Sequence, residues 1–215
     1  MKHLEIGSTL MFGGLEWNVL DIKNDSALII TKHIIEQHAY HDAYVDVTWE
    51  NCALRQYLNR DFYNRFSDIE KQKIIPTQIE NLDNQWYGTK GGLDTVDYVF
   101  LLSIEEVACR YFGDSSGNLY HPRKNKRYWF ERKDANNPKR SAGFEGEDGY
   151  VWWWWLRSPG RNNIKAVYIH GDGNIGIQGN NIFKGNVGGP FRNGDGQGGV
   201  RPALWIKLNN EISNK

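Results

Sequence analysis

The stretch of sequence that decides the fold is WWWWLRSPG at residues 152–160. A second motif, GVRPALW at residues 199–205, closes the segment that follows it. Tryptophan combines a large apolar surface with a polar N–H group, so it suits cores with irregular edges as well as contact surfaces. Aromatic bulk bounds both ends of residues 161–200, whose own sequence has almost no ordinary core pattern. This arrangement predicts a rigid frame that carries a displayed segment, and it favours binding over catalysis.

Residues 161–200 hold eleven of the 23 glycines and seven asparagines. Few of these side chains could fill a core, so we expect the segment to lie across a scaffold that the rest of the chain builds. Residues 167–170 and 175–178 predict two strands joined by a turn at 171–174, because Gly and Asn readily supply positive φ. Residues 202–208 predict a closing strand with alternate apolar side chains on one face.

Within the frame, we expect two of the four tryptophans at positions 152–155 to lie in the core and two to be partly exposed. Arg157 and Arg201 belong to the two motifs. The arginine guanidinium group donates several hydrogen bonds in a fixed planar arrangement. Both arginines are therefore expected to be structural and to bind loop carbonyls or acidic partners.

Alternating apolar and polar residues over 15–22, followed by a β-rich apolar run over 26–31, predict a hairpin. A further strand is predicted over residues 97–102. Thr48 is the expected cap of a helix with one apolar face, and a short amphipathic segment is expected at 61–66. Strands and helices of this kind together predict an α+β fold with antiparallel strands and two or three helices.

Two capping boxes mark the starts of two further helices. Ser67 precedes Glu70 by three residues, and Ser103 precedes Glu106 by three residues. In a capping box each side chain binds the backbone N–H group of the other residue, which satisfies donors that the helix leaves free. The first of these helices is expected to end near Ile75.

The length of 215 residues suits one domain over residues 1–215. Residues 113–149 are polar, basic in the middle, and interrupted by Gly and Pro. We interpret them as a surface insertion with a short helix around residues 128–132. The basic run at 123–127 is followed by acidic residues, which favours a solvated surface over a phosphate-binding patch.

The 26 basic and 26 acidic residues cancel, which argues against nonspecific nucleic-acid binding and against an anionic membrane as partner. No run approaches the ~20 apolar residues of a membrane span. The first residues lack the apolar core of a signal peptide. We expect a soluble chain that is cytoplasmic as synthesised, with a place in a phage particle or surface display by another export route left open.

Several motifs along nearly the whole chain, apart from the insertion, carry a resemblance to a known family. They are the two C-terminal motifs together with GGLEWNVL at 13–20, LRQYLN at 54–59 and DYVFLLS at 97–103. The chain resembles a bacterial domain family of Firmicutes and their phages. That family is similar in layout to the C-type-lectin-like fold that formylglycine-generating enzymes share.

The chain also resembles the variable proteins of diversity-generating retroelements. In those proteins, adenine-directed mutation diversifies a C-terminal segment that ends just before an invariant closing strand. The resemblance implies a C-type-lectin-like domain with residues 161–200 as the variable display region. Its ligand would be a protein or a glycan on another cell, and no cofactor would be required.

The asparagines bear on this resemblance because asparagine codons are rich in adenine. The resemblance implies that the ligand-binding positions are exposed and diversified residues between the two motifs. The candidates are Asn162, Asn163, Tyr168, His170, Asp172, Asn174, Asn180, Asn181, Phe183, Asn186 and Asn193. The alternative is that Asn and Gly serve turns, in which case the domain is an invariant structural or regulatory module.

An enzyme of the formylglycine-generating type is the least favoured interpretation. It would need reactive cysteines near the C-terminal site, and the tail has none. Cys52 and Cys109 lie in expected helices, where a free cysteine acts as a small buried hydrophobe. Two cysteines are also too few for a disulfide scaffold.

Metal binding has two weak candidates in the sequence. The histidines at 33, 38 and 41 match no metal motif in their spacing. The oxygen-rich triplets at 172–174 and 193–195 could bind calcium. Turn formation is favoured over calcium because the Glu-Pro-Asn and Trp-Asn-Asp motifs of calcium-dependent lectins are missing.

Overall fold

Two five-stranded sheets form the framework of the computed structural model, which describes residues 4–121, 130, 134–146, 150–183 and 197–208. The fold is mixed α+β, with mostly antiparallel sheets and few helices, as the sequence predicts at this level. Two small two-stranded sheets complete the strands of the described residues. In the part of the chain that the structure describes, no helix is both long and apolar enough to cross a membrane.

The first sheet is antiparallel and has the strand order β1-β2-β3-β14-β5. Asn24, with a φ of 51°, lies in the turn between β2 and β3, so the predicted N-terminal hairpin is confirmed. The closing strand β14 is confirmed too, and it lies between β3 and β5 with Leu204 opposite Ile29. The strands of this sheet are β1 (Thr9–Phe12), β2 (Leu15–Lys23), β3 (Ser26–Thr31), β5 (Ile74–Ile75) and β14 (Ala203–Lys207).

The second sheet has the strand order β12-β11-β10-β13-β4. Its pairs are antiparallel except β10 with β13, which run parallel with Trp154 opposite Gly199. The predicted C-terminal hairpin is confirmed as β11 and β12, joined by the turn at 171–174. The strands of this sheet are β4 (Glu36–His38), β10 (Trp154–Pro159), β11 (Lys165–Ile169), β12 (Ile175–Asn181) and β13 (Gly198–Val200).

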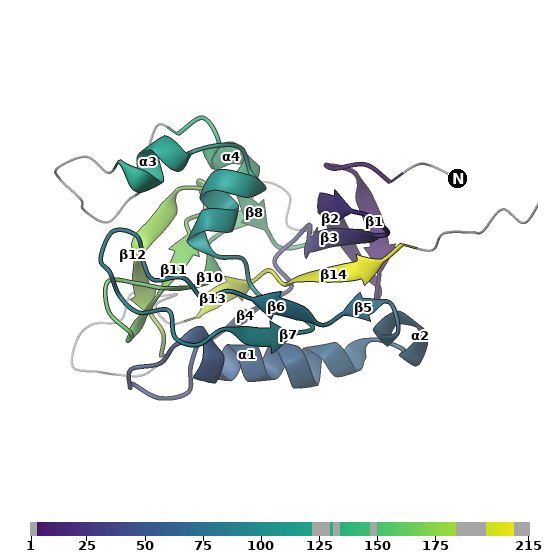
Figure 1. Ribbon diagram of the computed structural model, residues 1–215, viewed down its shortest axis with the longest axis horizontal. Coiled ribbons are helices and arrows are strands. Elements are labelled where there is room, and N and C mark those ends of the chain that lie inside the picture. Colours follow the sequence, from purple (N-terminus) through teal and green to yellow (C-terminus); the bar gives the residue numbers. More distant parts are fainter. Residues whose placement is uncertain (1–3, 122–129, 131–133, 147–149, 184–196, 209–215) are drawn as a thin grey trace, which may run out of the picture.

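Two of the crossings of the chain between the two sheets lie side by side. One crossing leads from β3 to β4, and the other leads from β13 to β14 (Figure 1). The N–H group of Ile35 donates to the Val200 carbonyl at 3.0 Å, and that of Thr31 donates to the Pro202 carbonyl at 3.0 Å. The closing motif therefore belongs to both sheets and holds them together.

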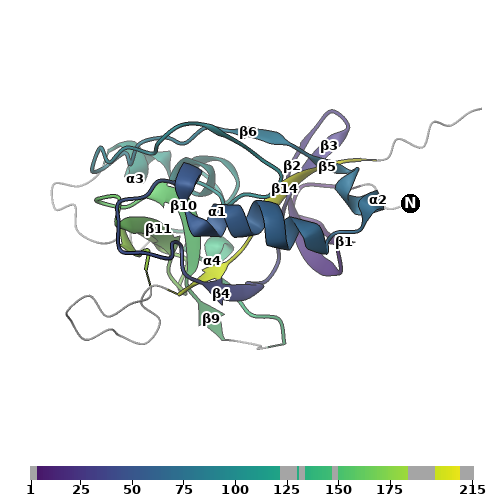
Figure 2. The ribbon, with the colours of Figure 1, turned by 90° about the horizontal axis from the view of Figure 1, so that it is seen from below.

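A helical run lies along one side of both sheets (Figures 1 and 2). Its first α-helical turn begins after Cys52, whose Sγ accepts a hydrogen bond from the Arg55 N–H group at 3.4 Å. Thr48 occupies the predicted cap position, just before η1, but its side chain makes no capping hydrogen bond. The segment predicted separately at 61–66 is the end of this run. Its parts are η1 (Trp49–Asn51), α1 (Ala53–Tyr57), η2 (Leu58–Phe62) and η3 (Tyr63–Arg65).

Both capping boxes are confirmed. The Ser67 N–H group donates to Glu70 at 2.8 Å, at the start of α2 (Asp68–Lys71). The Ser103 N–H group donates to Glu106 at 2.7 Å, just before η4 (Glu106–Arg110). The first helix is shorter than predicted, because the residues after it enter the first sheet as β5.

The strand predicted over residues 97–102 was wrong. Only β7 (Thr95–Asp97) is a strand there, and it pairs with β6 (Thr77–Ile79). The Asn59 side chain explains why the ladder stops, because its Oδ1 accepts hydrogen bonds from the N–H groups of Tyr98 at 2.7 Å and Val99 at 3.2 Å. A side-chain amide thus replaces a neighbouring strand as the hydrogen-bond partner of these two residues, and only Phe100 pairs with a strand again, at Ala203 of β14.

The described part of residues 113–149 is not a surface insertion throughout. Phe130 is buried and its ring stacks 6.0 Å from that of Trp86, and the fully buried Arg140 pairs with Asp134 at 2.8 Å. Apolar side chains and paired charged side chains in this segment therefore complete the core. The polar composition of the segment hides this contribution. Most of the predicted helix at 128–132 lies outside the described residues. The elements of this region are α3 (Ser116–Tyr120), α4 (Asn137–Arg140) and β8 (Ala142–Gly143), which pairs with β9 (Val151–Trp152).

Candidate functional site

The four consecutive tryptophans divide as predicted, with two in the core and two partly exposed. Trp154 and Trp155 are fully buried, whereas Trp152 and Trp153 are half-buried. The indole N–H of Trp154 donates to the Arg140 carbonyl at 3.0 Å, and that of Trp155 donates to the His38 carbonyl at 2.9 Å. The Trp154 indole therefore ties β10 to α4, and the Trp155 indole ties β10 to β4 within the same sheet.

Arg157 is structural, as predicted, and its guanidinium group joins three segments. It donates to the Leu101 carbonyl at 2.8 Å, to the Glu80 carbonyl at 3.2 Å and to the Glu106 carboxylate at 2.5 Å. Burial alone would raise the pKa of Glu106, but the Arg157 guanidinium and the Ser103 N–H group hold that pKa below its ordinary value. Glu106 therefore stays charged and serves both its capping box and Arg157.

Arg201 is the second structural arginine and connects the two sequence motifs. Its Nε donates to the Thr31 carbonyl at 2.9 Å, and its guanidinium carbon lies 5.0 Å from the ring centroid of Trp154. Burial lowers the pKa of Arg201 to about 10. Within the described residues no carboxylate pairs with it. The carbonyl and the indole face hold this cation at the crossing between the sheets.

Residues 161–200 do not simply lie across a scaffold, and that prediction was wrong. Val167, Ile169, Ile175 and Ile177 of the hairpin are all fully buried. The two strands β11 and β12 therefore build part of the core themselves. Their apolar side chains alternate with Gly, Asn and Tyr, which hides the core pattern in a glycine-rich composition.

Five of the predicted site residues come together at the open end of the hairpin. Lys165 lies opposite Asn181 in the strand register, and the Ile182 N–H group donates to the Ile164 carbonyl at 3.3 Å. These contacts bring the start of β11 beside the end of β12. We call the resulting group the hairpin rim: Asn162, Asn163, Asn180, Asn181 and Phe183. Asn162 is exposed and the other four are half-buried.

The amide groups of the hairpin rim are partly used within the fold. Asn163 donates to the Lys90 carbonyl at 3.0 Å, and Lys165 donates to Asn181 Oδ1 at 3.2 Å. The Oδ1 atom of Asn180 accepts a hydrogen bond from the next N–H group at 3.0 Å. The Asn162 side chain forms no hydrogen bond with any described residue. The rim thus combines amides that shape the backbone with one that is free for contact.

Three predicted site residues lie at the opposite end of the hairpin, in its turn. His170 and Asp172 are exposed and pair at 3.0 Å. Asn174 is only 1% exposed, so the prediction that it is an exposed contact position was wrong. The Asp172 carboxylate accepts a hydrogen bond from the Asn174 N–H group at 2.9 Å, and Gly173 has a φ of 83°. Residues 172–174 therefore form a turn, which is the interpretation that the sequence favours over a calcium site.

Tyr168 lies between the two ends of the hairpin, in an aromatic cluster with Trp153 and Trp155. Its ring meets that of Trp153 edge to face at a centroid distance of 5.4 Å, and Trp153 meets Trp155 in the same way at 4.7 Å. A Cβ atom at Gly176 would collide with the Tyr168 ring, and one at Gly198 would collide with both indoles. These two glycines leave room for the rings against the sheet.

Trp153 is a site residue that the sequence-based prediction missed, although a signal was present. Successive side chains of a strand point to opposite faces, so Trp153 must face away from the buried Trp154. Its ring lies beside those of Tyr168 and Trp155 and is half-exposed, whereas the Trp155 ring is buried. The last two candidates, Asn186 and Asn193, lie outside the described residues, as does the triplet at 193–195.

Neither cysteine has the surroundings of a reactive thiol. Cys52 is buried at the start of α1, and burial raises its pKa to about 12. Burial and then the nearby Glu105 raise the pKa of Cys109 as well. Within the described residues, no group of three or more His, Cys, Asp or Glu side chains could hold a metal ion.

We expect Cys52 to remain unmodified by a thiol reagent such as DTNB in the native protein, because the thiolate is the reactive form. Cys109 is half-buried and is expected to react slowly, and both thiols should react at once in denaturant. The release of thionitrobenzoate, with peptide mapping of the product, measures this. Rapid labelling of Cys52 in the folded chain would contradict the assignment and would favour the enzyme alternative.

Comparison with known proteins gives one match. The family described as "Domain of unknown function (DUF6273)" matches residues 24–208, from the turn before β3 to the residue after β14. Searches of curated proteins and of solved structures returned no match. The match includes the second sheet, the helical run, both tryptophan-containing motifs and the closing strand. The chain therefore belongs to the DUF6273 family.

Proposed function

We propose that this domain is a non-enzymatic ligand-binding module of C-type-lectin-like fold, and that its recognition surface lies on the β11–β12 hairpin. The observation that carries the proposal is the gathering of the hairpin rim. Five residues from two separated parts of the segment 161–200 meet at one end of the hairpin. The buried Trp154, Trp155 and Arg201 fix the strands beneath them.

The chemistry of this surface suits recognition of a protein or a glycan. Rim amides can donate and accept hydrogen bonds, while the half-exposed rings of Tyr168 and Trp153 offer rigid apolar faces with polar edges. Antibody loops use the same combination, because aromatic anchors lose little conformational entropy and amides adapt to different partners. A frame that fixes the backbone keeps the entropy cost of binding low.

We further propose that the domain is the variable protein of a diversity-generating retroelement. The closing strand β14 supports this proposal, since it follows the proposed variable segment directly and lies inside the first sheet. Changes at the hairpin rim would leave that strand and its partners untouched. The buried Asn174 and the turn residues around it would belong to the fixed part.

Sequencing the gene and its surroundings tests the retroelement part. We expect a near-copy of the codons for residues 161–200 beside a reverse transcriptase gene, with differences confined to adenines of the copy. The differing codons should include those of the hairpin rim and should spare that of Asn174. Absence of any such copy, or differences spread equally over all four bases, would exclude a retroelement origin.

A printed glycan array tests the binding part independently of the gene. The intact chain is compared with Asn162→Ala and with a double variant that combines Asn162→Ala and Asn181→Ala. Asn59→Ala is unsuitable as a control because the Asn59 side chain binds the backbone of another segment. The control is Gln37→Ala, because the Gln37 side chain in β4 is exposed. Binding that the rim variants weaken and the control preserves would support the proposal. If all variants bound glycans as the intact chain does, the binding site would lie outside the hairpin rim.

The alternative of an invariant module rests on a specific observation. Asn163, Asn180 and Asp172 all hold backbone groups of their own segment or of a neighbouring one. If the Asn residues serve only these contacts, Asn163→Ala should destabilise the fold by about 0.5–1.5 kcal/mol, the net contribution of a typical hydrogen bond. A loss below about 0.5 kcal/mol would match a surface position instead. Denaturant titration distinguishes the two.

A further inference from the structure

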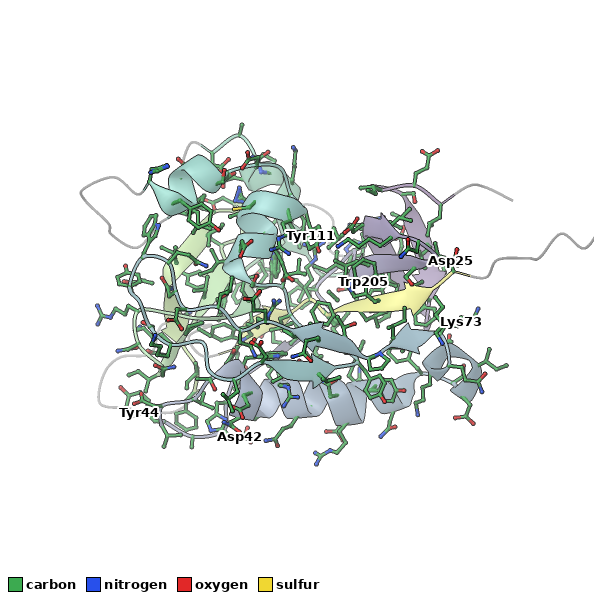
Figure 3. All side chains as sticks on the ribbon, viewed as in Figure 1. Asp25, Asp42, Tyr44, Lys73, Tyr111 and Trp205 are labelled. Carbon is green, nitrogen blue, oxygen red and sulfur yellow. The ribbon has the colours of Figure 1, made fainter. Side chains whose placement is uncertain are left out.

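A polar cavity of about 240 Å³ lies between the first sheet, β6 and the end of η4, away from the hairpin rim. Trp205 of β14 and Tyr111, which follows η4, contribute to its wall from different elements in the middle of the molecule (Figure 3). Lys23, Gln78 and Glu80 complete the part of the wall that a ligand would meet. None of the rim residues lines it.

The floor of the cavity is rigid because its charged groups bind each other. Glu106 and Arg157 both line the cavity, and they form the buried ion pair already described. Phe100 lies against the Arg157 guanidinium, with 6.0 Å between the guanidinium carbon and the ring centroid. Preorganised walls lower the entropy cost of binding a ligand. The shape of this cavity is therefore set by the same residues that hold the frame together.

The side chains above this floor offer hydrogen-bonding groups that the fold does not use. The Tyr111 hydroxyl and the Gln78 amide form no side-chain hydrogen bond with any described residue. The Tyr111 hydroxyl is neutral at physiological pH and can donate, since burial, and then the nearby Glu106, raise its pKa further above that range, to about 12. The half-buried Trp205 adds a flat apolar face.

The charges around the cavity argue against an anionic ligand. Lys23 pairs with Asp21 at 3.2 Å and lies 5.4 Å from the centroid of the Trp205 ring. Arg110 pairs with Glu105 at 2.7 Å. An anion would have to displace a carboxylate from one of these cations. The Glu80 carboxylate forms no ion pair with a described residue, so it can accept hydrogen bonds from hydroxyl groups. A neutral ligand with several hydroxyl groups can instead use donors and acceptors in place.

The size of the cavity narrows the ligand class further. Pockets for drug-sized molecules usually measure about 300–1,000 Å³. At about 240 Å³ this cavity suits a smaller molecule of one ring. We propose that it binds a single neutral sugar ring, with the apolar face of the ring against Trp205 and its hydroxyl groups bonded to Tyr111, Gln78 and Glu80. This site is separate from the hairpin rim and does not depend on the function proposed for it.

Saturation-transfer NMR of the full chain with glucose, galactose, mannose, N-acetylglucosamine and N-acetylgalactosamine tests this proposal. Acetate and tetramethylammonium serve as charged probes of similar or smaller size. We expect at least one sugar to bind in the millimolar range and to bind more tightly than either ion. Failure of all five sugars to bind, or tighter binding of an ion, would overturn the proposal.

Matched variants locate the bound sugar. Tyr111→Phe keeps the ring and removes one hydroxyl, so affinity should fall about fivefold, the equivalent of one hydrogen bond. Gln78→Ala should have a similar effect, and Trp205→Leu should abolish binding. The controls are Tyr44→Phe, whose exposed side chain lies far from the cavity (Figure 3), and the exposed Gln37→Ala. Melting curves confirm that each variant is folded.

The pattern across these variants also separates this site from the hairpin rim. Loss of sugar binding in Asn162→Ala with full binding in Tyr111→Phe and Gln78→Ala would overturn the cavity proposal while supporting the rim. Loss in the cavity variants alone would support the cavity and leave the rim to its own test. Equal binding by all variants would overturn the cavity proposal.

Discussion

Replacing Arg157 with alanine is expected to lower the free energy of unfolding by about 3–5 kcal/mol, because it leaves a buried carboxylate without its cation. The side chains of Arg157 and Glu106 are only 5% and 14% exposed. The carbonyl groups of Leu101 and Glu80 would lose a donor at the same time. Three segments that meet beneath the second sheet would thus be weakened together. Urea titration followed by circular dichroism measures the loss.

Arg110→Ala is the matched control for this experiment. Arg110 pairs with Glu105 at the same kind of distance, 2.7 Å, but its side chain is 53% exposed. Exposed ion pairs contribute about 0–1 kcal/mol, so the control should remain close to the unchanged protein. Equal losses in Arg110→Ala and Arg157→Ala would contradict the role given to the buried pair.

The pH dependence of the Arg157→Ala effect provides a second check. The pKa of Glu106 lies below its ordinary value of 4.5 in the folded chain. A carboxyl group of this kind contributes stability that is fully present above its unfolded pKa and is lost as the pH falls through the folded pKa. The difference between Arg157→Ala and the unchanged protein should therefore shrink on acidification. A difference that stays constant from neutral pH into acid would show that the ion pair is not its cause.

Trp154→Ala is expected to lower the free energy of unfolding by a similar amount, about 3–5 kcal/mol. The indole is fully buried, donates to the Arg140 carbonyl at 3.0 Å, and lies beneath the Arg201 guanidinium. Its removal would leave a cavity, free a carbonyl group and deprive a buried cation of one of its contacts. Typical domains are stable by only about 5–15 kcal/mol, so the loss would be a large part of the total.

Trp152→Ala is the matched control, since it removes an indole from the same run of four. Trp152 is half-buried and stacks on the exposed Tyr150 at a centroid distance of 6.0 Å. A loss of about 1 kcal/mol, typical of an average substitution, is expected. If both variants lost the same stability, the division of the tryptophans into buried and exposed members would be contradicted.

Local rules predicted those elements whose partners lie close in the sequence. The two hairpins followed from alternation and turn residues, and the capping boxes at Ser67 and Ser103 followed from a spacing of three residues. The prediction that two of the four tryptophans lie in the core was also confirmed, but alternation along a strand does not identify which two, because the neighbours Trp154 and Trp155 are both buried. The hairpins and the capping boxes depend on short-range geometry that the sequence displays directly.

Other features depend on contacts between distant residues, which a pattern along the chain does not show. The strand expected over 97–102 is cut short by the Asn59 side chain, about forty residues earlier in a helix. Asn174 has the composition of an exposed turn but is buried. The cavity combines Lys23, Gln78, Tyr111 and Trp205 from four separate segments of the chain, so no local motif could reveal it.

The central claim is that the hairpin rim is a substitution-tolerant surface on a fixed frame, and a protease-resistance experiment tests it most directly. One displayed library randomises the five rim positions, and a matched library randomises Trp154, Trp155, Arg157 and Arg201. We predict that most rim variants resist the protease as the unchanged chain does, and that few frame variants do. Equal loss of resistance in the two libraries would contradict the claim.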